Sequence, residues 1–376
     1  MALDIDDYVA RFHEEPGYLN FAAVGPIGDT VRSEAESFQM LLTGGRFGAL
    51  APFFEQDARV RAAVAALTGF RTDQVAFQPN TSQGLMHAVF GLTGGVALSA
   101  AEFPSLPFAA VRAQQALGAV NPRWLETDHG RVTPGNIRDQ LDASVVAVAV
   151  SLVDFRTGHL VDLEGIRQVI GDRLLIVDAI QGFGVVDAPY EVADVVAAGG
   201  QKWMRAGWGT GFLALSDRAL HHLTPVWSGF TGSTHDALPV DEVLPPAADA
   251  RAYTISNGDP IAMARFAAAL EELADVGVAA VNTRLAERVS EVLDAADEFA
   301  LPVVSPRAEA ERAGIVVLAP EPEQLTVLAA SLHNHGVSVT VRGGTVRLSP
   351  HASTGADSLE LLRSALLSYA TASGTR

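Results

Sequence analysis

The sequence predicts an α/β protein built on a mainly parallel sheet. Three short apolar runs, at residues 144–150, 174–177 and 194–198, are each bounded by polar or glycine-containing segments. Continuous apolar runs of this length are typical of parallel strands whose two faces are both covered. The length of 376 residues exceeds one ordinary hydrophobic core and therefore predicts two packed domains.

The other elements follow in chain order. We expect a short amphipathic helix or arm at residues 1–17, helices at 29–42 and 52–68, and strands at 75–77 and 96–99. A long helix should follow Asp259-Pro260, because proline suits the first helical turn.

The last third of the chain predicts a small α+β domain, with two short strands around Gly343-Gly344. Before it lies an acidic loop that contains Pro239, Pro245 and Pro246, where we expect the large domain to end. The large domain is therefore assigned to residues 18–248, and the small domain to residues 1–17 and 249–376.

Composition excludes several classes of protein. The chain has 26 Lys plus Arg against 44 Asp plus Glu, a net charge of −18, and no basic run, so nucleic acid is not an expected partner. Because no apolar stretch approaches the ~20 residues of a membrane span and the acidic N-terminus lacks the order of a signal peptide, we predict a cytoplasmic protein without a membrane partner. The absence of cysteine excludes disulfides and thiolate metal sites, and no metal site is predicted.

Lys202 is the only lysine, and the other 25 of the 26 Lys plus Arg residues are arginines. Arginine stays protonated, whereas lysine can lose its proton and form a Schiff base with a carbonyl compound. The alternative is that Lys202 is simply the last surface lysine in an arginine-rich chain.

The residues around Lys202 favour the chemical interpretation. Asp178 ends one predicted strand and Gln181 follows it, while Gln201 and Lys202 follow the next strand. The carboxyl ends of parallel strands meet at the edge where open α/β sheets bind ligands. A carboxylate and a lysine at one such edge match the needs of pyridoxal phosphate, whose aldehyde binds lysine and whose ring nitrogen needs an acid.

The segments DAIQG, GGQKWM and GWGTGFLAL, which lie between residues 178 and 215, resemble the class V aminotransferase family of fold-type I pyridoxal-phosphate enzymes. That group also contains kynureninase, cysteine desulfurases and isopenicillin N epimerase-like proteins. The resemblance extends from about residue 18 to 366. It implies a seven-stranded, mainly parallel sheet flanked by helices, a small α+β C-terminal domain, pyridoxal 5′-phosphate on Lys202 and a homodimer.

The phosphate of that cofactor is expected at Asn80, Thr81 and Ser82, where a strand turns into a helix. Backbone N–H groups and hydroxyls at a helix N-terminus suit an anion, although the same residue types also serve as ordinary helix caps. The resemblance favours the phosphate, with Gln201 as a further contact.

The cofactor ring is expected to lie between other residues that the resemblance identifies. Phe103 would stack on the ring, Asp178 would bind its nitrogen, and Gln181 would bind its hydroxyl. Ser151 and Asp154 occupy the family's positions beside the cofactor. Asp154 either serves there, with its charge bonded to Arg156, or caps a turn.

The substrate is expected to bind at the segment VRLSPH, in which the resemblance assigns Arg347 to the α-carboxylate. A guanidinium binds a carboxylate with two hydrogen bonds. Arg342 is the reserve candidate, and an interdomain ion pair is the alternative role for Arg347. Asn20 is a further substrate contact or a turn residue.

The dimer partner is expected near two other segments. The resemblance implies that residues 227–233 reach across the dimer. Asp259 stands where the family often has a threonine that assists the partner's phosphate, and a carboxylate does not fill that role.

The predicted activity is that of a pyridoxal-phosphate enzyme acting on an amino acid through an aldimine on Lys202, which then serves as general base at the α-carbon. Proton return to the cofactor gives transamination, loss of a β-substituent gives lyase chemistry, and return to the opposite face gives epimerisation. We predict an aminotransferase with a keto acid as second substrate, because transamination needs no further residue. A lyase of the kynureninase or cysteine-lyase type ranks second, although Leu106 departs from the acidic residue common in kynureninases.

Three other activities are set aside. Transfer of sulfur to a protein persulfide needs a cysteine, and the chain has none. A nicotinamide dehydrogenase is not indicated, because the glycines at 207, 209 and 211 do not follow a strand and open a helix. A non-catalytic sensor of the cofactor would need a partner-binding module, and none is predicted before Tyr18.

Overall fold

The computed structural model describes residues 3–234 and 241–374. Its large sheet has the strand order β1-β7-β6-β5-β4-β2-β3, and every strand except β7 runs in the same direction. The strands are β1 (Val75–Phe77), β2 (Gly94–Ser99), β3 (Val120–Leu125), β4 (Val145–Ser151), β5 (Leu174–Asp178), β6 (Val195–Gly199) and β7 (Gly211–Leu215). The predicted seven-stranded, mainly parallel sheet is confirmed.

The sheet separates two hydrophobic layers. Alternate side chains of β5 enter different layers: Leu175 and Val177 join one, and Leu174 and Ile176 join the other. This is the two-residue periodicity of a strand covered on both faces. It explains why the apolar run is continuous.

Helices cover both faces of the sheet. One layer contains residues of α5 (Thr81–Phe90), α6 (Ser105–Leu117) and α9 (Asp217–His222). The other contains residues of α4 (Gln56–Thr68), α8 (Leu163–Ile170) and α10 (Pro260–Val276). The described chain also forms α2 (Asp29–Gly44), α3 (Ala51–Phe54) and α7 (Pro134–Arg138). The helix predicted at 52–68 is thus divided at Glu55 into α3 and α4.

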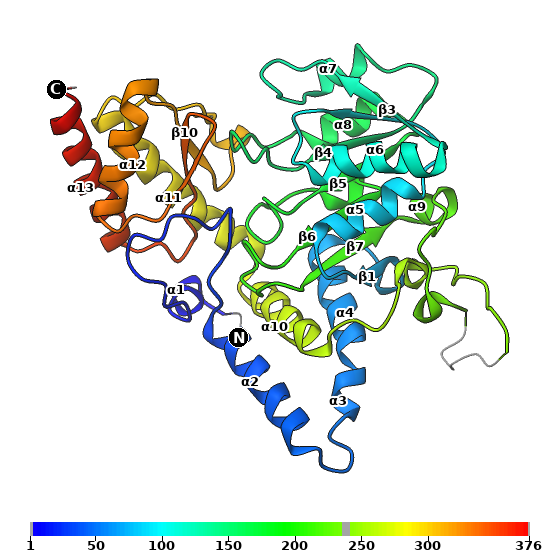
Figure 1. Ribbon diagram of the computed structural model, residues 1–376. Coiled ribbons are helices and arrows are strands. Elements are labelled where there is room, and N and C mark those ends of the chain that lie inside the picture. The colour runs from blue at the N-terminus through cyan, green and yellow to red at the C-terminus, as the bar shows by residue number, and fades with distance from the viewer. Residues whose placement is uncertain (1–2, 235–240, 375–376) are drawn as a thin grey trace.

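The small domain lies beside the large sheet and contains the C-terminal elements (Figure 1). Its antiparallel sheet has the order β8-β10-β9. The elements are α11 (Val278–Glu298), β8 (Val316–Leu318), α12 (Leu325–Asn334), β9 (Thr340–Arg342), β10 (Thr345–Leu348) and α13 (Ala356–Ser373). The two strands predicted around Gly343-Gly344 are β9 and β10.

The N-terminal arm contacts both α10, through Arg11 and Glu272, and the C-terminal elements. After α1 (Ile5–Val9), the Gly17 N–H donates to the Ser358 hydroxyl at 2.9 Å, and Tyr18 pairs with Ser338. By contrast, α10 packs against the large sheet. Its Phe266 stacks on Phe212 of β7, with ring centroids 6.5 Å apart. The domain boundary after residue 248 stays a prediction, and Pro239 of the boundary loop lies outside the described residues.

Within residues 3–234 and 241–374, no helix combines the length and the apolar character that a membrane span requires.

Candidate active site

Asp178 ends β5 in the middle of the large sheet. Its side chain is buried, at 1% exposure. Oδ1 accepts a hydrogen bond of 3.1 Å from the Ile180 N–H, but Oδ2 has no partner in the described chain. Burial raises the pKa of this carboxyl from 3.8 to about 6. A buried acceptor without a partner is costly, so this oxygen is available to a ligand.

Lys202 lies just beyond β6, the strand next to β5. It is 9% exposed, and its Nζ lies 5.4 Å from the ring centroid of Phe103. Burial lowers the pKa of this amine from 10.5 to about 8; the charge of Asp178 opposes the shift and that of Arg347 adds to it. A substantial share of the amine is therefore neutral near pH 8, as a nucleophile or general base requires.

The loop that carries Lys202 is held by distant parts of the chain. The Gly25 N–H donates to the Gln201 carbonyl at 2.9 Å, and a Cβ at Gly25 would lie 2.0 Å from the Lys202 carbonyl oxygen. Three residues after the lysine, Arg205 takes a left-handed backbone with φ of 55°. Its buried guanidinium pairs with Glu14 at 2.5 Å. Glu14 of the N-terminal arm and Gly25 beyond it thus fix the lysine loop.

Sequence reasoning missed both Arg205 and Glu14. They stand 191 positions apart, and no spacing rule links them. The available signal was the position of Arg205 directly after the lysine segment.

Three polar residues, Asn80, Thr81 and Ser82, lie at the start of α5. Asn80 caps the helix, because its Oδ1 accepts from the Gln83 N–H at 2.9 Å. The buried hydroxyl of Thr81 has no partner among the residues described. A Cβ on Gly199 would lie 3.1 Å from that hydroxyl and 2.4 Å from Gln201 Oε1. Only glycine at position 199 leaves this space open at the positive end of the helix.

Ser82, the third predicted phosphate contact, is already paired. Its hydroxyl lies 2.7 Å from the hydroxyl of Ser105, at an exposed position. Of the three predicted residues, Thr81 is therefore the one with an unused buried group.

Two of the predicted ring contacts have defined neighbours. The Phe103 ring meets Phe155 edge to face, with centroids 5.2 Å apart. Gln181 Oε1 accepts from the Trp203 indole N–H at 3.0 Å, and its Nε2 donates to the Ala22 carbonyl at 3.1 Å. The second N–H of that amide makes no hydrogen bond with the described residues and is open to a ligand.

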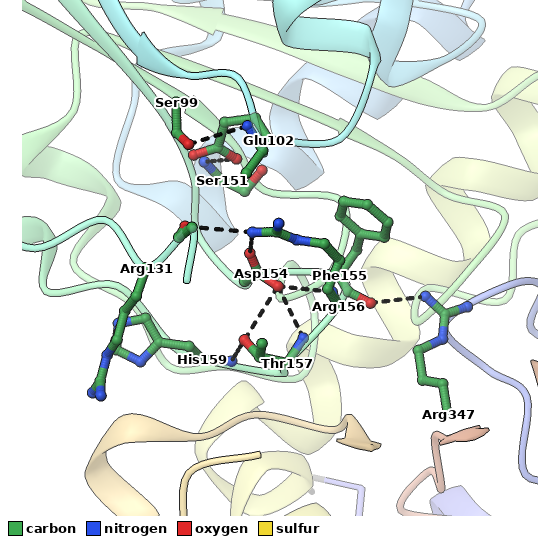
Figure 2. Close-up of polar contacts among 12 residues, drawn as sticks. Ser99, Glu102, Arg131, Ser151, Asp154, Phe155, Arg156, Thr157, His159 and Arg347 are labelled. Atoms are coloured by element: carbon green, nitrogen blue, oxygen red, sulfur yellow. Dashed lines mark hydrogen bonds and ion pairs between the residues drawn. The ribbon is translucent and has the colours of Figure 1, made fainter. Parts of the chain in front are cut away.

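Figure 2 shows another acid, Glu102, which lies just beyond the end of β2. Its Oε2 accepts from the backbone N–H of Ser151 at 3.1 Å. Burial raises the pKa of Glu102 to about 7; hydrogen bonding to Ser151 opposes this shift, and the charges of Asp154 and Asp178 contribute to it. Sequence reasoning missed this residue, although it directly precedes Phe103 at the end of β2.

Asp154 forms a closed turn (Figure 2). Oδ1 accepts from the backbone N–H of Arg156 at 2.7 Å and from the N–H and hydroxyl of Thr157 at 2.9 and 3.1 Å. Oδ2 accepts from the Arg156 guanidinium at 2.8 Å. The carboxylate therefore both caps the turn and neutralises Arg156, which leaves it little capacity for a ligand.

Arg347 projects from β10 toward the large domain. Its guanidinium donates to the Phe155 carbonyl at 3.1 Å and contacts the Thr340 hydroxyl at 3.4 Å. The Thr340 hydroxyl in turn donates to Asn20 Oδ1 at 2.8 Å. No Asp or Glu in the described ranges pairs with Arg347, so its charge is available to an acidic substrate.

These residues fit pyridoxal phosphate. The cofactor needs a lysine amine, an acid for its ring nitrogen and donors for its phosphate. The structure offers Lys202, together with Oδ2 of Asp178 and the hydroxyl of Thr81, neither of which has a partner among residues 3–234 and 241–374. Asp259, by contrast, caps α10 by accepting from the N–H groups of Ile261 and Ala262.

Two curated proteins resemble the chain in sequence. A probable hercynylcysteine sulfoxide lyase of Mycobacterium tuberculosis is 28% identical over 95% of this chain and 89% of its own length. A probable cysteine desulfurase of Methanothermobacter thermautotrophicus is 27% identical over 56% of each chain.

Solved structures share the fold. The apo cysteine desulfurase of Thermococcus onnurineus superposes with a TM-score of 0.80 at 18% identity, over 93% of both chains. The cystine C–S lyase C-DES, solved with cysteine persulfide, has a TM-score of 0.84 at 17% identity, over 93% of this chain and 97% of its own.

The family comparison covers most of the chain. A model of the family described as aminotransferase class-V matches residues 51–374. The match spans both β5 with Asp178 and the loop of Lys202. The chain therefore belongs to the class V aminotransferase family of pyridoxal-phosphate enzymes.

Proposed function

We propose that this protein is a pyridoxal-phosphate-dependent lyase that breaks the bond between Cβ and sulfur in an amino acid. The observation that carries the proposal is the similarity to the Mycobacterium tuberculosis relative, which extends over 95% of this chain. The name of that relative describes a lyase for a sulfoxide of a cysteine derivative. The second curated relative is named for the removal of sulfur from cysteine, so sulfur chemistry is common to both.

The absence of cysteine favours elimination over desulfuration. A desulfurase that accepts sulfur as a persulfide needs a protein thiolate, and this chain has no cysteine among its 376 residues. Elimination needs no such acceptor, because the sulfur group leaves with the electron pair of the C–S bond. With one water, the rest of a cysteine-type substrate becomes pyruvate and ammonia.

The roles of the residues follow from their environments. Bound pyridoxal phosphate supplies an electron-withdrawing ring beside the α-carbon. Lys202 would hold the cofactor, Asp178 its ring nitrogen, and Thr81 its phosphate. Arg347 orients the substrate through its α-carboxylate. Lys202, with a pKa lowered to about 8, then removes the α-proton as the general base.

Transamination is the second candidate, and it is the activity that the sequence predicts first. The family description favours it, and it needs no residue beyond those of the site. It differs from elimination in requiring a keto acid as a second substrate. Epimerisation stays a prediction that the same experiment tests.

The experiment follows product formation by the purified holoenzyme without any keto acid. L-Cysteine, L-cystine and S-alkyl-L-cysteine sulfoxides are added one at a time, and pyruvate, ammonia and the sulfur product are measured. We expect many equivalents of pyruvate per enzyme from at least one of them. The Lys202→Ala variant should give none, and borohydride treatment should attach the cofactor to Lys202 in the parent protein.

Other outcomes identify other activities. At most one equivalent of keto acid, with turnover restored by added keto acid, would show an aminotransferase. Inversion of the amino acid without cleavage would show an epimerase. Either result would replace the lyase proposal.

We further propose that the chain works as a homodimer, with residues 227–233 at the interface. In support, Phe230 of this segment and the nearby Ile255 are 49% and 44% exposed, and the Gly229 N–H donates to the Thr254 carbonyl beside Ile255. Sedimentation velocity should give the mass of a dimer, and Phe230→Asp together with Ile255→Asp should shift it toward the monomer. The cytoplasmic location stays a prediction.

A further inference from the structure

A cavity of about 690 Å³ lies between the β9–β10 hairpin and the turn after β4. Its lining includes three arginines, Arg156, Arg342 and Arg347, and none of its described lining residues is Asp or Glu. The chain as a whole has a net charge of −18. A cavity with only positive formal charges in so acidic a protein indicates an anionic ligand.

The hairpin is built to present these charges. In the register of β9 and β10, Thr340 pairs with Arg347, and Arg342 pairs with Thr345. Because side chains alternate along a strand, these four residues share one face of the hairpin. All four line the cavity, while the alternate residue Val346 is buried in the core.

The three arginines differ in how their charges are balanced. Arg156 is neutralised by Asp154 at 2.8 Å. Within the part of the chain that the structure describes, the Arg347 guanidinium bonds to a carbonyl and a hydroxyl and to no acid. Arg342 is exposed, and its guanidinium lies 5.8 Å from the ring centroid of Phe155. This guanidinium has no hydrogen bond or ion pair with any residue in the ranges described.

The guanidiniums of Arg342 and Arg347 therefore line one cavity, and no acid among the described residues pairs with either of them. Burial and the neighbouring charge of Arg342 lower the pKa of Arg347 to about 10. Like charges held close together repel each other. A ligand with two acidic groups would neutralise both guanidiniums, one with each group. One carboxylate at Arg347 leaves the charge of Arg342 without a partner.

We propose that the substrate carries two carboxylates, and that Arg342 binds the second one, on the sulfur side chain. The α-carboxylate then lies at Arg347, as the proposed function requires, and the inference rests on that function for the position of the amino acid. The substrate class is a cysteine bearing an acidic S-substituent, and a simple S-alkyl cysteine fills only half of the cationic site.

The test compares a matched pair of amino acids, S-(2-carboxyethyl)-L-cysteine and its amide, S-(2-carbamoylethyl)-L-cysteine. They differ in charge and hardly in size. Their dissociation constants are measured from the change in the absorbance spectrum of the holoenzyme, which reports binding whether or not cleavage follows. We expect the acid to bind about tenfold more tightly than the amide, the effect of one charge-assisted pair at a partly exposed site.

The variant Arg342→Gln should remove this preference by weakening the binding of the acid while leaving the amide within about twofold. Arg342→Lys should restore part of it. The control is Arg138→Gln, which removes an equal charge from an exposed residue of α7. It should leave the preference intact.

Equal binding of the two compounds by the parent protein, or a preference that persists in Arg342→Gln, would overturn the second-carboxylate site. A clear preference in binding without cleavage of any sulfur compound would instead refute the lyase function and leave the site standing. The two failures are therefore distinguishable.

Discussion

Two aspartates near the ends of neighbouring strands have opposite environments. Asp178 at the end of β5 accepts one hydrogen bond, and its second oxygen has no partner among the described residues. Asp154, three residues beyond β4, accepts bonds from four donors on Arg156 and Thr157. The Asp154 carboxylate thus stabilises the fold through its hydrogen bonds, whereas the Asp178 carboxylate is available to a ligand.

The difference has a cost for the protein without cofactor. An unsatisfied buried polar group destabilises a fold by about 1–3 kcal/mol. The pKa of Asp178 is raised to about 6, so its contribution to stability is present at acidic pH and is lost as pH rises through about 6. At neutral pH the apo protein therefore holds a buried, ionised carboxylate, and the protonated ring of the cofactor would stabilise it.

The largest expected effect is that of Asp178→Ala. Removing one partner of a buried charged pair costs about 3–5 kcal/mol, so cofactor affinity and kcat/KM should fall by about 10² to several times 10³-fold. Cofactor content after dialysis and the rate of pyruvate release measure the two losses. Near-normal turnover would show that Asp178 does not serve the ring nitrogen.

Asp178→Asn sharpens this result in the apo protein. Because asparagine does not ionise, this variant should gain stability relative to the parent as pH rises from 4 to 7. Urea denaturation at several pH values measures the gain. A constant difference across that range would mean that Asp178 has an ordinary pKa.

Asp154→Ala should show the reverse pattern. Three donors of the turn and the Arg156 guanidinium lose their acceptor, and the unfolding free energy should fall by about 2 kcal/mol. Cofactor content should stay near that of the parent protein. Loss of cofactor without loss of stability would place Asp154 at the ligand and erase the contrast with Asp178.

Much of this arrangement follows from local sequence. The apolar run of β5, the lone lysine and the proline after Asp259 each have a local physical signature. Strand β3 does not, because its central residues are polar or exposed and include Pro122. A strand at the sheet edge needs little apolar character, so no run of hydrophobic residues marked it.

The sequence alone could not predict whether each carboxylate is hydrogen-bonded within the fold. Asp154 and Asp178 are the same residue type, and both follow apolar strands. What separates them is the donors that folding brings within reach, and those depend on backbone geometry. Glu14 and Arg205 were unpredictable for the same reason, because their contact joins segments 191 residues apart.

Thr81 and Ser82 extend the comparison to hydroxyls. Thr81→Val removes a buried hydroxyl without a partner in the described chain, so the apo protein should keep its stability while the dissociation constant of the cofactor rises about tenfold. Ser82→Ala removes a hydroxyl already bonded to Ser105 and should change that constant less. Titration of both apo variants with pyridoxal phosphate checks this order, and an equal or larger effect for Ser82 would reverse it.

The smallest expected effect is a shift in the pH dependence of cofactor capture. Only the neutral amine of Lys202 attacks the aldehyde. Its pKa is lowered to about 8, so the rate of capture by the apo protein should rise with pH up to about 8 and then level off. Stopped-flow absorbance between pH 6 and 9.5 measures this profile.

Two variants should move that midpoint in opposite directions. The charge of Asp178 raises the pKa of Lys202 and that of Arg347 lowers it. Asp178→Asn should therefore shift the midpoint of capture to lower pH, and Arg347→Gln should shift it to higher pH. If both variants moved the midpoint the same way, altered burial of the amine would explain the shifts. The unpartnered carboxylate would then not act on Lys202 through its charge.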